Sequence, residues 1–337
     1  MLLMPRESGK LIASLSKDVF IEEEGVKRIA YEVLEGLKTR VVHIDNFSQH
    51  ELHPSEHDSR AVDWIFVLDT LNFCFWTEGN DTKWKVSGQT GYFALCAAIK
   101  RAVNESRLIT DPKFYSTITK EELEYILRGD DESTKIPLLA ERLKCLHEVG
   151  KVLAEKYEGT FVNCIKSCDK SADKLLKLIV TQFECFRDDA DYRGHKVAIY
   201  KRAQILVGDI WACFRGKGLG EFHDIEIITM FADYRIPQVL VHFGAMRYSN
   251  PLLDKLQSGT ELTPGSLPEV EIRGCSIEVI ERVRDEVKSL IRQYPNLALR
   301  ESDCNAILID HFLWDYRRRH AGDLESIPFH KVKSIYY

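Results

Sequence analysis

Apolar residues at helical spacing are the feature that most constrains the fold of this chain. Residues 271–294 form a long run with one apolar face, and a repeat near 3.6 residues predicts a helix that buries that face. The apolar positions of this run are Ile272, Cys275, Val279, Val283 and Val287. The same spacing predicts helices over residues 6–15, 22–38, 91–104, 137–156, 171–186, 199–214, 229–244 and 303–319. Thr119, followed three residues later by Glu122, predicts a capped helix start.

A smaller part of the sequence favours β structure. Residues 40–63 are loop-like or weakly extended, and residues 63–76 have the aromatic and β-branched content of a strand, with which residues 84–86 could pair. Pro237 is expected to interrupt or re-aim the helix over 229–244. We therefore predict a mainly α fold with a small β element near residues 40–90. We expect a single domain over residues 1–337, with a division into 1–130 and 131–337 as the alternative.

Charge and cysteine content argue against several classes of protein. The formal net charge of −6 disfavours bulk nucleic-acid binding, which needs a positive face to displace counterions. The nine cysteines are scattered and include no C-x-x-C pair, so we expect reduced thiols, no zinc site and a cytoplasmic, or also nuclear, location. The first ten residues do not resemble a signal peptide, and no apolar run has the length of a membrane span. We expect no membrane association.

The densest group of chemically useful side chains lies at residues 231–238. It places the carboxylate of Asp233, the phenol of Tyr234 and the guanidinium of Arg235 side by side, between two apolar runs. Burying such charges is costly unless they are paired or used. Either an Arg–Asp pair ties a helix to its neighbours, or Asp233 lies in a cleft of low dielectric where it stabilises a developing positive charge.

A second acid, Asp69, lies among five aromatic residues and close to Asn72. In a strand, an offset of three residues would place the two side chains on opposite faces, whereas in a turn they could converge. Asp69 could accept paired N–H groups from a heterocycle, and Asn72 could add a donor and an acceptor. The alternative is a cap at the edge of a strand. The neighbouring aromatic residues could form the walls of a pocket for a flat polar ring.

A third group spans residues 200–211. Lys201 and Asp209 are eight residues apart, which puts them broadly on one side of a helix. Lys201 or Arg202 could contact a phosphate or ribose, with Asp209 deeper in the cleft; the alternative is a solvated basic patch with an exposed acid. His43 sits beside apolar residues and is either a simple core or surface histidine or a further binding residue.

At these residues the chain resembles the queuosine salvage protein family, the queuosine 5′-phosphate N-glycosylases (hydrolases). The central block of the resemblance is Thr229-Met230 followed by residues 231–238, and the other blocks are residues 63–76, 91–95, 200–207, 269–273, 327–330 and 336–337. The resemblance covers nearly the whole chain. It implies a helical core related to helix-hairpin-helix DNA glycosylases, release of queuine from queuosine 5′-phosphate for reuse in tRNA modification, and no metal or organic cofactor.

The resemblance also implies roles for the candidate residues. Asp233 is expected to stabilise the ribosyl cation and activate water, with Asp209 as the alternative. Asp69 or Asp209 is expected to receive the N–H edge of the base. The candidates for stacking on the ring are Phe73, Phe75, Trp76, Phe231 and Tyr234. The candidates for the 5′-phosphate are Lys201, Arg202 and Arg235, and the remaining candidates for substrate binding are His43 and Asn72.

Two other functions stay open at this point. The same pocket could belong to a carrier that binds queuine or its nucleotide without cleaving it. A DNA or RNA glycosylase is the third alternative, and the negative net charge weighs against it. We expect a small-molecule substrate and no direct binding of nucleic acid.

Overall fold

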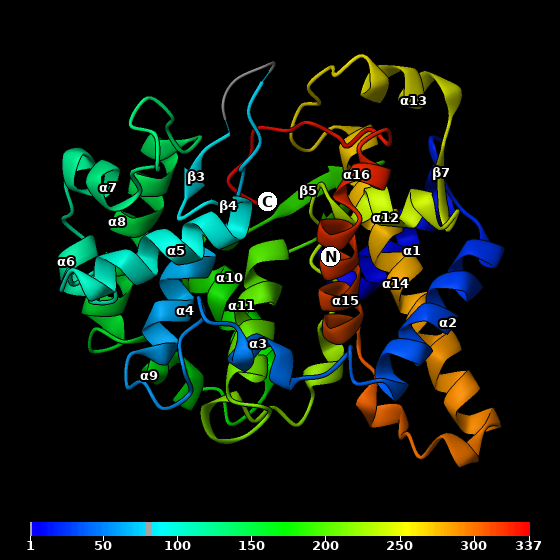
Figure 1. The fold of residues 1–337 in the computed structure, drawn as a ribbon, viewed down its shortest axis with the longest axis horizontal. Coiled ribbons are helices and arrows are strands. Elements are labelled where there is room, and N and C mark those ends of the chain that lie inside the picture. The colour runs from blue at the N-terminus through cyan, green and yellow to red at the C-terminus, as the bar shows by residue number, and fades with distance from the viewer. Residues whose placement is uncertain (1, 79–82) are drawn as a thin grey trace. The chain divides into compact units, whose positions relative to one another are not determined.

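The computed structural model describes residues 2–78 and 83–337. Within these residues the fold is mainly helical, with seven short strands, which confirms the predicted class (Figure 1). No helix in the described residues is long and apolar enough to cross a membrane. The chain divides into two compact units: Met1–Ile44, Asp188–Gln204 and Glu226–Lys333 form unit 1, and Asp45–Arg187, Ile205–Ile225 and Ser334–Tyr337 form unit 2. The grouping of the chain into domains stays a prediction.

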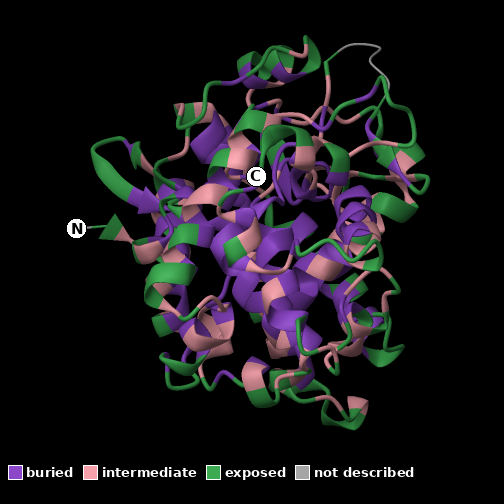
Figure 2. Cartoon of the chain, turned by 90° about the vertical axis from the view of Figure 1, so that its left-hand side faces the viewer, coloured by how far each residue is buried: buried purple, intermediate pink, exposed green. Residues whose placement is uncertain are grey.

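Unit 1 is built around α14 (Leu267–Gln293), a helix of 27 residues, coloured yellow to orange in Figure 1. It packs against α1 (Pro5–Leu15), α2 (Glu23–Lys38), α12 (Ile236–His242) and α15 (Ala306–Arg319). Its central part is buried on nearly every side. Figure 2 colours buried residues purple and shows that they gather in the interior of the fold. A side chain at Gly274 would meet Ile12 of α1. A glycine there lets the two helices approach closely.

Short strands complete unit 1. β1 (Leu2–Leu3) runs parallel to β6 (His195–Ala198), which pairs antiparallel with β5 (Asp189–Tyr192). β2 (Val19–Ile21) pairs antiparallel with β7 (Met246–Tyr248), with Val19 opposite Tyr248. The remaining helices of this unit are α13 (Asn250–Gln257), α16 (Ala321–Leu324) and the first turn of α11 (Lys201–Cys213).

Unit 2 contains the rest of α11 and most of the short helices. Its core includes a cluster of stacked and tilted rings, in which the centroids of Phe66 and Phe161 lie 4.5 Å apart, with Phe183 and Phe186 beside them. Buried aromatic pairs of this geometry add to the free energy of area burial. The helices are α3 (Asp45–Gln49), α4 (Ala61–Thr70), α5 (Gly91–Asn104), α6 (Pro112–Tyr115), α7 (Lys120–Ile126), α8 (Leu139–Lys156), α9 (Phe161–Lys166) and α10 (Ala172–Gln182).

Several predicted helices are confirmed within one or two residues, including those over 6–15, 22–38 and 91–104. The side chain of Thr119 caps α7 by accepting a hydrogen bond from the amide of Glu122. Ser171 caps α10 in the same way. In both cases the hydroxyl satisfies an amide that has no partner inside the helix.

The strand predicted over 63–76 is wrong. Residues 61–70 form α4, in which nine of ten residues are buried, and residues 73–76 follow it without regular structure. A helix that is apolar on every side shows no helical period in its sequence, so its aromatic and β-branched content was misleading. The predicted partner segment instead forms a hairpin of β3 (Lys85–Val86) with β4 (Gln89–Thr90).

The helix predicted over 229–244 is also wrong in its first half. Residues 228–233 have no regular structure, and α12 begins at Ile236. Pro237 therefore lies in the first turn of a helix, where its missing N–H and fixed φ are tolerated. This loop carries the acid that the sequence singled out.

Candidate active site

Asp233 lies three residues before the first residue of α12, and its side chain binds two amides at the start of that helix. Its Oδ1 accepts hydrogen bonds from the amides of Arg235 at 2.9 Å and Ile236 at 2.8 Å. The positive end of the helix dipole and two amide donors both favour a negative charge at this point. In the described part of the chain Oδ2 accepts no hydrogen bond, so this oxygen is available to a ligand. The Arg–Asp side-chain pair considered as one alternative is absent between Arg235 and Asp233 among the described ion pairs; the backbone amide of Arg235 makes the contact instead.

A second carboxylate, Asp310 of α15, lies within electrostatic range of Asp233. Its Oδ2 accepts the amide N–H of Phe231 at 2.9 Å, and the residue is 5% exposed. Burial raises the pKa of Asp310 well above its ordinary value, and the charge of Asp233 raises it further; the Phe231 amide and Lys201 act in the opposite direction. Two neighbouring carboxyl groups in different environments are suited to different tasks.

The sequence reasoning missed Asp310. It sits in no recognisable motif, and the sequence indicates no more of its helix than apolar spacing over residues 303–319. A signal was nevertheless present, because Asp310 interrupts the apolar stretch from Ala306 to Leu313. A carboxylate inside such a stretch is rarely buried without a purpose or a partner.

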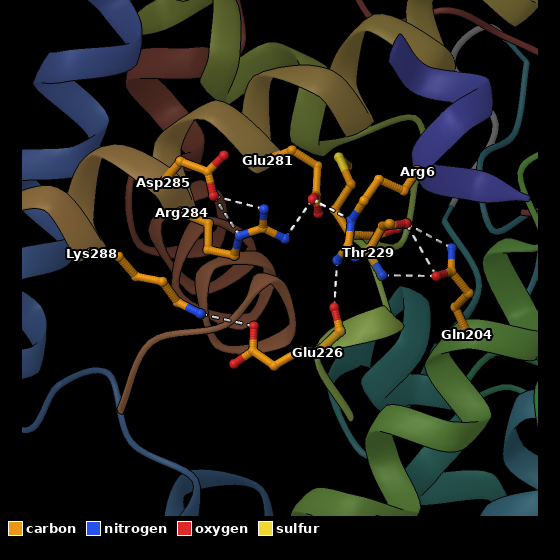
Figure 3. A network of polar contacts seen from close by, with 9 residues as sticks. Arg6, Gln204, Glu226, Thr229, Glu281, Arg284, Asp285 and Lys288 are labelled. Carbon is orange, nitrogen blue, oxygen red and sulfur yellow. Dashed lines mark hydrogen bonds and ion pairs between the residues drawn. The ribbon is translucent and has the colours of Figure 1, made fainter. Parts of the chain in front are cut away.

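Two buried side chains hold the loop that precedes Asp233. Gln204 of α11 binds Thr229 through two hydrogen bonds. Its Oε1 accepts a hydrogen bond from the Thr229 amide at 2.8 Å, and its Nε2 donates one to the Thr229 hydroxyl at 2.9 Å. Arg273 of α14 donates from Nε to the carbonyl of Ala232 at 3.0 Å. Figure 3 shows the Gln204–Thr229 contact together with an ion-pair network around Glu226 and Glu281. The loop is thereby fixed at both ends by fully buried partners.

Arg273 also links this loop to the start of α11. Its two Nη atoms bind the carboxylate of Asp188 at 2.9 and 2.7 Å, and Nη1 lies 3.2 Å from Glu269. Asp188 in turn accepts the backbone amide of Lys201 at 3.0 Å. All these side chains are nearly inaccessible to solvent. A bidentate pair of this kind is strong and directional, so Arg273 fixes Ala232 and Lys201 relative to each other.

The other candidates from the central motif lie in the same unit. The ring centroid of Phe231 is 6.1 Å from that of His311, and burial lowers the pKa of His311 to about 4. The ring of Tyr234 is 5.4 Å from that of Phe329, over which the guanidinium of Arg235 stacks at 4.3 Å. The structure thus brings together a carboxylate pair, aromatic rings and cations in unit 1.

Two further basic candidates and one histidine complete the predicted residues of unit 1. Lys201 is 6% exposed and Arg202 is 1% exposed, so the solvated basic patch considered for them is wrong. His43 follows α2, and its Nε2 lies 2.9 Å from Nη2 of Arg40. The role of each in substrate binding stays a prediction.

The predicted acids of unit 2 also converge. Asn72 Nδ2 lies 3.5 Å from Asp69 Oδ1 just after the end of α4, as expected for a turn rather than a strand. Asp69 and Asp209 are buried. Burial raises the pKa of Tyr92 and of Cys96 well above their ordinary values, and the charges of Asp209 and Asp69 raise both further. The end of α4, the first half of α5 and the middle of α11 therefore share one acidic environment.

The aromatic candidates of unit 2 lie on an irregular segment that Arg142 of α8 holds in place. Its guanidinium donates to the carbonyls of Leu71, Phe73 and Cys74 and stacks over the Phe73 ring at 4.3 Å. Phe75 lies 6.4 Å from Trp84, and Trp76 is buried. These contacts are those of core packing; stacking of Phe73, Phe75 and Trp76 on a substrate stays a prediction. In residues 2–78 and 83–337, no group of three or more His, Cys, Asp or Glu is placed to hold a metal ion.

Comparison with known proteins identifies the family of the chain. The family described as queuosine salvage protein matches residues 52–337. A Bos taurus protein named queuosine 5′-phosphate N-glycosylase/hydrolase is 48% identical over 341 residues, which cover 100% of this chain and 99% of that protein. Proteins of the same name are 44% identical in Mus musculus, over 99% of both chains, and 38% identical in Sphaerobacter thermophilus, over 97% of this chain and 95% of that protein. The chain belongs to the queuosine salvage protein family.

Proposed function

We propose that this protein hydrolyses the N-glycosidic bond of queuosine 5′-phosphate and releases queuine for reuse in tRNA modification. Full-length relatives with that name support the activity. The observation that carries the chemistry is the pair of neighbouring carboxyl groups in unit 1, of which Asp233 is held by two amides and Asp310 is buried with a raised pKa. Most enzymes that hydrolyse glycosides through an oxocarbenium-like transition state use such a pair of carboxyl groups.

The two carboxyl groups would divide the work. Queuine is a 7-deazaguanine, so its ring lacks the N7 that a purine hydrolase protonates, and more of the barrier must fall through stabilisation of the ribosyl cation. The carboxylate of Asp233, with Oδ2 available, would stabilise that cation and accept a proton from the attacking water. Asp310, whose raised pKa keeps its proton at higher pH than usual, would donate to the departing base. The C1′–N bond breaks, water supplies the new hydroxyl at C1′, and the base leaves protonated.

The remaining contacts follow from the chemistry of the substrate. The 2-amino-pyrimidinone edge of the base presents adjacent N–H donors, which Asp69 or Asp209 would accept. Asp209 is also the alternative to Asp233 for the catalytic role. Phe231 and Tyr234 would stack on the base, and a cation among Lys201, Arg202 and Arg235 would bind the 5′-phosphate.

We also propose a fold likeness to helix-hairpin-helix DNA glycosylases, a cytoplasmic or also nuclear location, and no direct binding of nucleic acid. The mainly helical fold supports the first, although a shared fold does not carry a substrate. The net charge of −6 supports the last.

The test is the release of free base. Purified protein is incubated with queuosine 5′-phosphate, and the products are followed by mass spectrometry. The expected result is queuine from the wild type and little or none from Asp233→Asn. Tight binding without release of base by the wild type would favour the carrier instead. Release of base by both proteins would keep the activity and move the catalytic role to Asp209 or Asp310.

A further inference from the structure

A pocket of about 270 Å³ lies in unit 1 beside the central motif. Its walls come from the first turn of α12, the end of α13 and the segment that follows α16. The lining residues that matter here are Arg235, Gln238, Glu325, Phe329 and Lys331. Two of these side chains are cations, and among the described lining residues Glu325 is the acidic one.

Gln238 binds a second cation, Arg317, at the edge of this pocket. Its Nε2 donates to the carbonyls of Leu324 at 3.3 Å and Ile327 at 2.6 Å, which fixes the orientation of the amide. Its Oε1 therefore faces the two guanidinium groups of Arg235 and Arg317, each at 3.2 Å. Two positive charges thus share one neutral oxygen.

The positive charge of this pair is poorly compensated by the protein. Within the described residues, Arg235 has no carboxylate at ion-pair distance, and Arg317 reaches only Glu325, at 4.0 Å. The side chain of Glu325 is 74% exposed, whereas that of Arg317 is 12% exposed. Burial lowers the pKa of Arg317, and the charge of Arg235 lowers it further, whereas the charges of Glu325 and Asp233 act in the opposite direction. Cations that are held together and partly desolvated in this way favour the binding of an anion.

Aromatic stacking prepares one of the two cations for a directional contact. The guanidinium of Arg235 lies over Phe329 at 4.3 Å and over Tyr234 at 5.4 Å. Stacking occupies the faces of the guanidinium plane and leaves its edge N–H groups for hydrogen bonding. A fork of this kind matches two oxygens of a phosphate, and Lys331, which also lines the pocket, adds a point charge.

We infer that this pocket, formed by Arg235, Gln238, Phe329 and Lys331 with Arg317 behind it, binds a phosphate dianion. One source is the 5′-phosphate of the nucleotide substrate, because the amide of Arg235 already bonds to Asp233; this source rests on the proposed function. The other source is free inorganic phosphate. Among the cationic candidates for phosphate contact, Arg235 lines this pocket. Arg317, which no sequence motif indicated, joins it through Gln238.

The test uses Arg317→Gln and Lys331→Gln. Arg317 interacts with Asp233 only through its charge, and an effect on catalysis through Asp233 cancels in the ratio of two substrates measured below. Arg247→Gln is the matched control: Arg247 also stacks on an aromatic ring, that of Phe20, and lies outside the pocket. Two quantities are measured for each folded protein. The first is kcat/KM for queuosine 5′-phosphate divided by kcat/KM for queuosine, and the second is the rise in melting temperature on titration with inorganic phosphate. Arg317→Lys, which keeps the charge but loses the fork, serves as the second variant if Arg317→Gln does not fold.

If the pocket takes the substrate phosphate, the kcat/KM ratio falls about 10- to 100-fold in the pocket variants, the loss of one charge-assisted contact, and not in Arg247→Gln. If it takes free phosphate, the ratio stays constant while the phosphate-dependent rise in melting temperature shrinks in the pocket variants alone. An unchanged ratio together with an unchanged phosphate response overturns the inference. If the wild type cleaves neither substrate, the proposed function fails, and the phosphate titration still decides about the pocket.

Discussion

Replacing Asp233 separates two roles that the structure gives to one side chain. Oδ1 caps α12 through two amides, and the negative charge is proposed to stabilise the ribosyl cation. Asn is as good a cap as Asp, so Asp233→Asn should keep the stability of the fold. Asp233→Ala loses the cap as well, which costs about 1–2 kcal/mol. For a chain of this size we expect a fall in melting temperature of about 1–3 °C.

The two variants should nevertheless lose activity alike. Removing an electrostatic stabiliser of a developing charge typically costs about 10²–10³ in kcat, or roughly 3–4 kcal/mol. The assay pairs thermal unfolding with single-turnover release of queuine, and Thr119→Ala is the control, because it removes the cap of α7 far from either carboxyl group in sequence. We expect Thr119→Ala to lose stability and keep its activity. Wild-type kcat in Asp233→Asn would refute the role of the charge, and equal destabilisation by Asn and Ala would refute the role as a cap.

Three further changes test the surroundings of the site. Because burial and then Asp233 raise the pKa of Asp310, the folded state binds a proton more tightly than the unfolded state, so stability should fall as pH rises above about 4, the ordinary Asp value; urea unfolding of Asp310→Asn should lack this slope. Arg273→Met leaves Asp188 buried without its partner and should cost about 3–5 kcal/mol, part of which Asp188→Leu in the same chain should restore; equal unfolding midpoints for wild type and Arg273→Met would contradict the network. Arg142→Met should cost about 3 kcal/mol or more, because the carbonyls that it binds, including that of Phe73, lose their donor, and near-ultraviolet circular dichroism should report the loosened aromatic rings.

The sequence predicted the amphipathic helices well and the fully buried one poorly. Where one face is apolar and the other polar, as in α2 and α14, spacing alone locates the helix. In α4 nine of ten residues are buried, so the pattern carries no period, and the choice between helix and strand depends on packing against α5, α8 and α9. Pro237 marks the start of α12 and does not interrupt a longer helix. Proline is tolerated in the first turn of a helix, so its effect depends on where the helix begins.

In the candidate site, the sequence likewise reveals residues that are adjacent along the chain but not contacts between distant elements. Asp233, Tyr234 and Arg235 are adjacent in sequence, so the sequence alone shows their grouping. Asp310 lies 77 positions after Asp233 in the numbering of the chain, and Phe231, whose amide it binds, comes from a different element. Such a contact arises only when α15 packs against α12, and no single sequence reveals it. The convergence of Arg235 and Arg317 on Gln238 has the same origin.

The most direct test of the account is the hydrolysis of queuosine 5′-phosphate in ¹⁸O-labelled water, with both products analysed by mass spectrometry. The account predicts one ¹⁸O atom in the released ribose 5-phosphate, none in queuine, and loss of both products when Asp233→Asn replaces the wild type. Intact nucleotide recovered from a stable complex with the wild type would contradict hydrolysis and leave a carrier. Label in queuine, or undiminished release by Asp233→Asn, would contradict attack of water at the ribose under the control of this carboxylate.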